Sequence, residues 1–202
     1  MVFYKRKQEH GKQDKVTKES SEGQMQASIK RSIFDYSVSI IICIVLAVII
    51  RNYVITRADV DGRSMNPTLK DKDIVFVEKI STLSEKYKRG SIIIFDAPRT
   101  DHDIYIKRVV GVAGDKIEIK NGKVYLNGKE LEEKYLAEGT LTKRGTFMAD
   151  KESFTVPKGY IFVMGDNRDF SEDSRAFGPV KLDAVKGRAI VRVFPMKTIK
   201  IL

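Results

Sequence analysis

The chain has 202 residues, of which 42% are hydrophobic, so it can bury the core of one domain of ordinary size and has sequence to spare. Its formal net charge is +10, but basic and acidic residues are interspersed and no long basic arm occurs, which argues against nucleic acid as a partner. The single cysteine excludes an intrachain disulfide and a zinc site built from several cysteines.

The N-terminal residues 1–31 are polar and charged, as in "KRKQEHGKQDKVTKESSEGQ". Such a composition cannot bury enough apolar surface to fold, so we expect a disordered tail.

An apolar segment follows at residues 32–55, with fifteen uncharged residues, mostly isoleucine and valine, between Asp35 and Arg51. A spanning helix needs about 20 residues, and charged side chains near its ends can reach the lipid headgroups. A membrane span, a cleaved signal peptide and a buried core helix are the three interpretations. The segment ends without the small residues of a cleavage site, which favours an uncleaved anchor.

The charges beside this segment predict its orientation. Eight lysine and arginine residues precede Asp35, and basic residues favour the cytoplasmic side of a membrane. We therefore expect a single-pass protein of the cell membrane, with a cytoplasmic N-terminus and residues 56–202 outside the cytoplasm.

Residues 56–202 have the pattern of a β domain. Short runs rich in valine, isoleucine, tyrosine and phenylalanine are separated by turn residues. Asn121-Gly122 lies between two such runs and predicts a hairpin, Asn127-Gly128 extends it to a meander, and "STLSEKY" predicts a short turn or helix. Residues 129–153 show no clear period and are typical of an insertion or long loop. The predicted fold class is all-β, a mainly antiparallel sandwich or barrel, with one N-terminal transmembrane helix.

The stretch "VDGRSMNPTLKDKDIVFVEK" presents Ser64 just beyond the apolar segment. A serine hydroxyl is a poor nucleophile unless a base accepts its proton. His10 lies in the polar tail, and the loop-like surroundings of His102 are more typical of a solvated residue. A lysine can replace histidine as the base if burial lowers its pKa.

The run "IYIKRVVGV" contains a lysine in an apolar strand pattern, Lys107. Strand alternation places Tyr105 and Val109 on its face, and Arg108 on the other. Spacing alone leaves two interpretations open: a catalytic base, or an edge-strand lysine that prevents aggregation.

A polar loop, "GDNRDFSEDSRAFG", follows the apolar run "YIFVM" and occupies residues 165–178. It is either a solvated loop or a device that orients a lysine, because aspartate and arginine two residues apart can pair and serines can bond an amine.

Together these stretches resemble type I signal peptidases, the membrane-bound serine proteases that remove signal peptides from exported proteins. "GRSMNPTL", "RGSIIIFDAP", "YIKRVVG" and "GDNRDFSEDSR" occur in the family's order after an N-terminal anchor, and the resemblance covers about residues 35–195.

The resemblance implies the following site. Ser64 is the acylating nucleophile with its backbone N–H as an oxyanion donor, Lys107 is the general base, and Ser171 holds the lysine amine. The remaining matched positions support the site: Arg108, Asp166, Arg168, Asp173 and Arg175. The substrates are pre-proteins that carry signal peptides, docked as an added strand with small side chains just before the cut.

The resemblance further implies a lipid bilayer as partner and neither cofactor nor metal, and we expect a monomer. Two positions depart from the family: Gly62 stands where some members carry a serine that helps the oxyanion, and Ala113 where proline is usual. Two alternatives are a self-cleaving repressor-type protease, which would need an N-terminal DNA-binding helix pair, and a membrane-tethered β binding module.

Overall fold

The structure is a computed structural model that describes residues 31–98 and 103–202. It divides into two units, Met1–Ile50 and Arg51–Leu202. The tail of residues 1–30, His10 and His102 lie outside the described residues.

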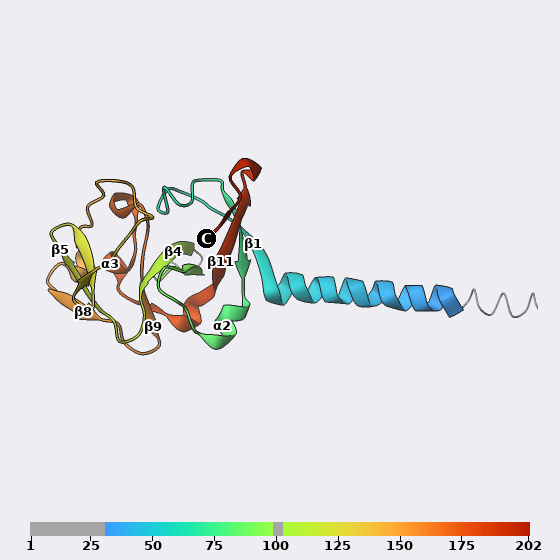
Figure 1. Cartoon of the computed structure of the whole chain (residues 1–202). Helices are drawn as coiled ribbons and strands as arrows, with labels where there is room; N and C mark the ends of the chain where they lie inside the picture. Colours follow the sequence, from blue (N-terminus) through green and yellow to red (C-terminus); the bar gives the residue numbers. More distant parts are fainter. Residues whose placement is uncertain (1–30, 99–102) are drawn as a thin grey trace, which may run out of the picture. The chain divides into compact units, whose positions relative to one another are not determined.

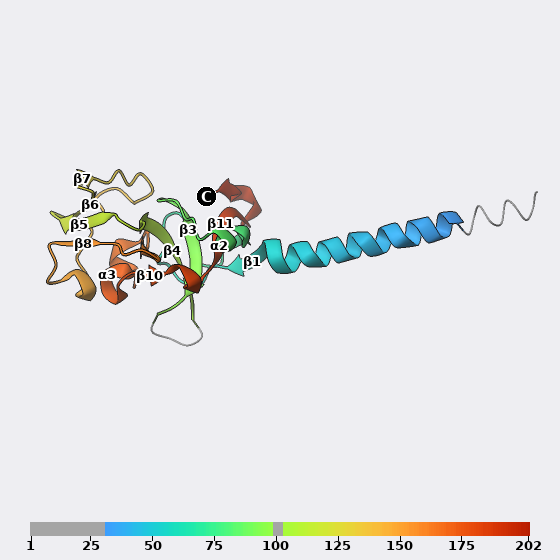
Figure 2. The same cartoon turned by 90° about the horizontal axis from the view of Figure 1, so that it is seen from below.

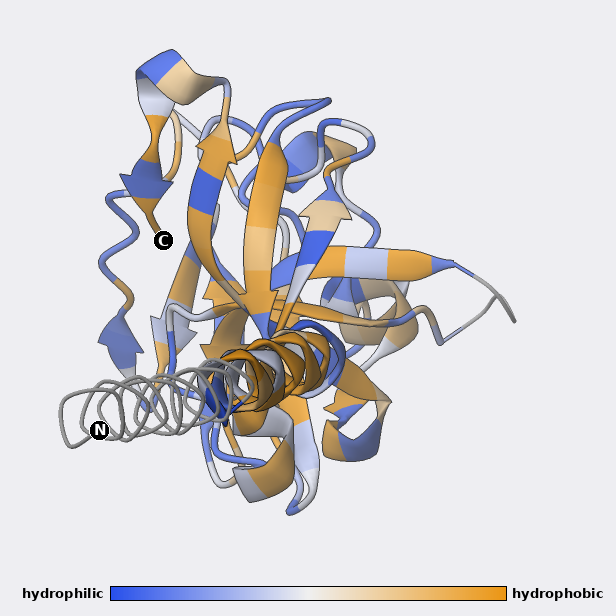
Figure 3. Cartoon of the chain, turned by 90° about the vertical axis from the view of Figure 1, so that its right-hand side faces the viewer, coloured by the Kyte–Doolittle hydropathy of each residue, from blue (hydrophilic) through white to orange (hydrophobic). Residues whose placement is uncertain are grey.

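The apolar segment forms one helix, Arg31–Val54, whose 24 residues are long and apolar enough to cross a membrane. The most apolar 18-residue stretch of this helix is not buried at all, whereas the same stretch of a core helix would be mostly buried. Figure 3 shows hydrophobic residues on most of its turns. Ser37 and Ser39 donate their hydroxyls to backbone carbonyls one turn earlier, at 2.8 and 2.9 Å, so these polar groups are satisfied within the helix. The last turn, η1 (Ile50–Val54), is a π-helix.

The second unit contains two antiparallel sheets (Figures 1 and 2). The larger sheet has the order β1-β2-β11-β3-β4-β9-β10, with β12 beside β11, and the smaller sheet has the order β7-β6-β5-β8. Strand pairing within the described residues is antiparallel throughout, which confirms the predicted fold class.

The strands of the larger sheet are β1 (Ile55–Asp59), β2 (Ile74–Glu78), β3 (Ile92–Asp96), β4 (Ile104–Gly111), β9 (Tyr160–Met164), β10 (Val180–Lys181), β11 (Val185–Phe194) and β12 (Lys200–Ile201). Those of the smaller sheet are β5 (Lys116–Lys120), β6 (Lys123–Leu126), β7 (Lys129–Glu130) and β8 (Ser153–Thr155). Short helical turns connect them: α2 (Ile80–Ser84), η2 (Thr146–Met148), η3 (Arg168–Phe170), α3 (Ser174–Phe177), η4 (Leu182–Ala184) and η5 (Met196–Thr198).

Local sequence signals account for several of these elements. Asn121 and Gly122 adopt φ values of 52° and 77°, the left-handed pair that a two-residue hairpin between β5 and β6 requires. Asn127 and Gly128 repeat this between β6 and β7, so the predicted meander is confirmed. The short helix expected at "STLSEKY" is α2. Between β7 and β8 the chain forms only the single turn η2.

Strand β4 is central, because it pairs with β3 along one side and with β9 along part of the other. The pairing with β9 begins only at Arg108, so Lys107 lies where that side of β4 has no strand partner among the described residues. Its side chain is only 4% exposed, however, unlike that of a lysine that shields an edge from aggregation. Apolar residues of β4 pack into two separate clusters, with Val109 in one and Val110 in the other. Lys107 is thus held at a fixed place, next to the point where the pairing of β4 with β9 begins.

Candidate active site

Ser64 lies in the turn that follows β1, and the core holds that turn in place. Val60 N–H donates to Asp73 O at 2.8 Å, which closes the loop at its base. Met65 and Leu69, on the C-terminal side of the serine, are fully buried. Gly62 has a φ of +85°, a conformation that would strain a serine, so the departure from the family at this position agrees with its local backbone.

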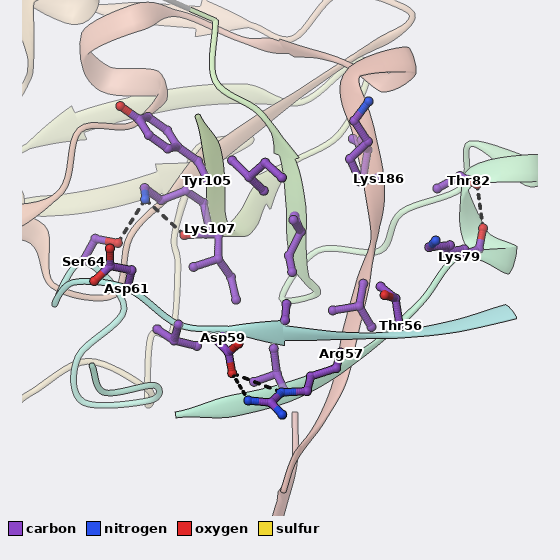
Figure 4. A pocket seen from close by; sticks show the side chains of 18 of the residues that line it. Thr56, Arg57, Asp59, Asp61, Ser64, Lys79, Thr82, Tyr105, Lys107 and Lys186 are labelled. Carbon is purple, nitrogen blue, oxygen red and sulfur yellow. Dashed lines mark hydrogen bonds and ion pairs between the residues drawn. The ribbon is translucent and has the colours of Figure 1, made fainter. Parts of the chain in front are cut away.

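Lys107 reaches Ser64 from β4. Its Nζ lies 3.0 Å from Ser64 Oγ and 3.1 Å from Ile106 O, and 4.9 Å from the centre of the Tyr105 ring (Figure 4). The lysine is only 4% exposed. Burial lowers its pKa to about 8, although the charges of Asp173 and Glu172 act to raise it. The amine can therefore lose its proton near neutral pH and accept another from the serine hydroxyl.

The polar loop is built around a buried ion pair, Asp173–Arg175, joined at 2.8 Å as their spacing predicts. Asp173 also accepts a hydrogen bond from Gly165 N at 3.0 Å and caps α3 through Arg175 N at 3.1 Å. Arg175 in turn donates to Arg168 O at 2.8 Å. The loop is thus a bonded structural unit, and the interpretation of it as a solvated loop is wrong.

The other aspartate and arginine of the loop do not pair with each other. Asp166 binds Arg108 of β4 through two hydrogen bonds, at 2.9 and 2.6 Å. Arg168 instead binds Glu133, and donates to Thr142 Oγ at 2.6 Å. The loop is therefore fastened on one side to the lysine's own strand and on the other to the segment between β7 and β8.

Sequence reasoning missed the residues of that segment. Glu133 and Thr142 hold Arg168, and the Tyr135 ring lies 4.0 Å below the Arg108 guanidinium. No motif marked them, because residues 129–153 have neither strand nor helix periodicity.

Ser171 lies beside the nucleophile, but its expected hydrogen bond to the lysine is not formed. Its Oγ is buried and has no hydrogen-bond partner among the described residues. A side chain at Gly165 would collide with both Ser171 Oγ and Ser64 O, so the loop and the serine turn are in close contact there. Asn167, also missed from the sequence, donates its backbone N–H to Ser64 O at 2.9 Å and its side-chain amide to Arg63 O at 3.1 Å.

A groove of about 980 Å³ begins at this pair and continues between β1 and β4, with Ser64 and Lys107 at one end and Lys79, Thr82 and Lys186 toward the other (Figure 4). Its apolar lining includes Val60, Val75, Val77, Ile94, Ile104 and Ile106. Residues 31–98 and 103–202 hold no group of three or more histidine, cysteine, aspartate or glutamate side chains suited to a metal ion.

An antiparallel β fold with a serine hydroxyl bonded to a buried amine, at the end of an open apolar groove, is typical of a serine-type peptidase that takes an extended chain. Residues 33–194 match the family described as "Signal peptidase, peptidase S26", and the chain belongs to this family.

Named relatives cover most of the chain. It is 35% identical to a signal peptidase IB of Staphylococcus aureus strain COL over 183 residues, which is 85% of this chain and 95% of the relative. It is 36% identical to a signal peptidase I of Bacillus amyloliquefaciens over 179 residues, 87% of this chain and 95% of that one. A crystal structure of a signal peptidase I from Enterococcus faecalis V583 is 36% identical, covers 51% of this chain and 96% of that chain, and has a TM-score of 0.44.

Proposed function

We propose that this protein is a membrane-anchored serine endopeptidase that cleaves N-terminal signal peptides from exported pre-proteins, with Ser64 as nucleophile and Lys107 as general base. Membership of the signal peptidase family supports the reaction and the substrate class. The observation that carries the assignment of the two residues is the contact of 3.0 Å between Lys107 Nζ and Ser64 Oγ, made by a lysine that is 4% exposed.

The reaction follows from this geometry. Neutral Lys107 takes the proton of Ser64 Oγ while Oγ attacks the scissile carbonyl carbon, and the backbone N–H of Ser64 stabilises the oxyanion. The lysine ammonium then gives its proton to the leaving amine, so that the peptide bond breaks and an ester to Ser64 remains. Lys107 next removes a proton from water, which attacks the ester, and the lysine returns that proton to Ser64 Oγ as the acyl half leaves as a carboxylic acid.

The strands beside the groove suit an extended substrate. Residues Ile104–Lys107 of β4 pair with β3 on one side. On the other side, the pairing of β4 with β9 begins only at Arg108. Within the described residues β1 has β2 as its partner on one side only. A peptide can therefore be bound by main-chain hydrogen bonds as an added strand, with small uncharged side chains facing the apolar lining.

We assign supporting roles to the polar loop. Ser171 Oγ is free to bond the amine, because it has no partner among the described residues, and we retain it as the residue that orients Lys107. Arg108, Asp166, Arg168, Asp173 and Arg175 fix the loop through their ion pairs. The helix Arg31–Val54 is the bilayer anchor, with the N-terminus cytoplasmic and the β domain outside.

The test is cleavage of a purified pre-protein by the full-length protein in detergent micelles. We expect one defined cut, abolished by Ser64→Ala and retained by the control Ser84→Ala, which removes a hydroxyl from α2 that donates to Ser81 O at 3.1 Å. Binding of the pre-protein without a cut would instead identify a membrane-tethered binding module.

A further inference from the structure

The groove accounts for only one side of the scissile bond. Its lining includes Ser64 and Glu172. It does not include Arg63, which precedes Ser64, or Phe170, which lies two residues before Glu172. An extended chain cut at Ser64 must continue past the serine, away from the groove. The side chains next to Ser64 that lie outside the groove are therefore candidates to contact that second half.

Arg63 and Phe170 form an exposed pair at this place. The Arg63 guanidinium carbon lies 4.0 Å from the centre of the Phe170 ring, which is 57% exposed. The backbone of Arg63 is held by Asn167, whose side-chain amide donates to Arg63 O at 3.1 Å. A guanidinium stacked on an aromatic face keeps its N–H donors in plane and pointing outward, with less freedom to lose when a partner binds.

The charge of Arg63 is not neutralised by a described side chain. Among residues 31–98 and 103–202 it forms no ion pair, and the aspartates close to this pair in sequence have other partners: Asp61 is paired with Lys72 at 3.6 Å and Asp169 with Lys143 at 3.1 Å. Its fork of donors suits the two oxygens of a carboxylate.

We propose that the Arg63–Phe170 pair is the binding site for the leaving half of the substrate, and that it selects an acidic side chain within the first few residues after the cleaved bond. This proposal rests on the proposed function. The apolar groove takes the half before the bond, which becomes the acyl group on Ser64. The half after the bond lies over the Phe170 ring, with a carboxylate on Arg63.

The proposal has a kinetic consequence. The leaving half departs when the acyl-enzyme forms, so Arg63 and Phe170 act on acylation and have no effect on hydrolysis of the ester. Selectivity at Arg63 should appear in kcat/KM for peptide cleavage. The rate at which a preformed acyl-enzyme is hydrolysed should stay unchanged.

The experiment uses the full-length protein in neutral micelles and a peptide series with one constant sequence before the cut. Glu, Gln or Lys is placed at each of the first four positions after it. We expect the wild type to prefer Glu over Lys by about fivefold at one or two positions, the size of one exposed ion pair, and less in high salt. Arg63→Gln should abolish this preference, Arg63→Lys should keep part of it, and Phe170→Leu should weaken it.

The control Lys181→Gln removes the same charge from exposed Lys181 in β10, at the opposite end of the sheet order from β1. An unchanged Glu-to-Lys ratio in Arg63→Gln overturns the proposal, and so does an equal change in Lys181→Gln, which would indicate general electrostatics. Equal loss on all peptides, together with weaker binding of Arg63→Gln to anionic vesicles, would identify a lipid contact and also overturn it. A wild type that cuts no peptide overturns the proposed function and this inference with it.

Discussion

Replacement of Lys107 by arginine keeps the positive charge but removes a base that can be neutral. An ordinary lysine, with a pKa of about 10.4, is neutral in roughly one molecule in 2,500 at pH 7. The pKa of about 8 that burial gives Lys107 raises the neutral fraction to about one in ten. In the proposed mechanism cleavage needs the neutral amine, so the rate should rise about tenfold between pH 7 and pH 9 and then level off. Lys107→Arg should be inactive throughout, because a guanidinium stays protonated in proteins.

The assay is kcat/KM for a signal-peptide substrate between pH 6 and pH 10, in the wild type and in Lys107→Arg. A matched control is Lys123→Arg, which makes the same change in β6 of the smaller sheet, where Lys123 is paired with Glu130 at 2.6 Å. The control should keep both the rate and the profile. A flat pH profile in the wild type, or an active Lys107→Arg enzyme, would refute the assignment of Lys107 as the base.

Three further predictions concern the loop, the lysine and the anchor. Ser171→Ala should lower kcat with an unchanged melting temperature. Asp173→Ala should instead reduce the free energy of unfolding in urea by about 3–5 kcal/mol, because it leaves Arg175 buried without its partner. The opposite pattern would reverse the two roles. Lys107→Met should stabilise the domain at pH 7 by up to about 3 kcal/mol, since the folded protein lowers the lysine pKa from 10.5 to about 8. The wild type gains stability as pH rises through that window, where the unfolded chain binds more protons, so thermal unfolding at pH 10 should show a smaller difference. Protease added to intact cells should cut the chain after Arg57 and spare the N-terminal tail, and protection of the β domain would contradict the orientation.

The elements that local sequence specifies could be predicted. Alternating apolar runs gave the strands, and Asn121-Gly122 gave the β5–β6 hairpin, because a two-residue turn needs the left-handed conformations that these residues tolerate. The apolar helix was predicted from length and composition in the same way.

Contacts between distant segments could not be predicted from spacing. How much of β4 is paired on its second side depends on β9, which begins more than fifty residues after Lys107 and pairs only from Arg108 onward. Asp166 seemed suited to Arg168 two residues on, but its partner is Arg108, 58 residues earlier. The place of Ser171 Oγ, packed against Gly165, depends on how two loops meet, and no one-dimensional pattern encodes that.

The three buried arginines of the site and its buried lysine differ in whether a carboxylate neutralises their charge. Each arginine is bonded to a carboxylate: Arg108 to Asp166, Arg168 to Glu133, and Arg175 to Asp173. Lys107 is buried to the same degree, but among the described residues its amine bonds only a hydroxyl and a backbone carbonyl. A paired buried cation is stabilised in its charged form, whereas an unpaired one is driven toward its neutral form by desolvation. The ion pairs around the lysine fasten the loop, whereas Lys107 has no such pair among the described residues, and burial lowers its pKa as the proposed role of general base requires.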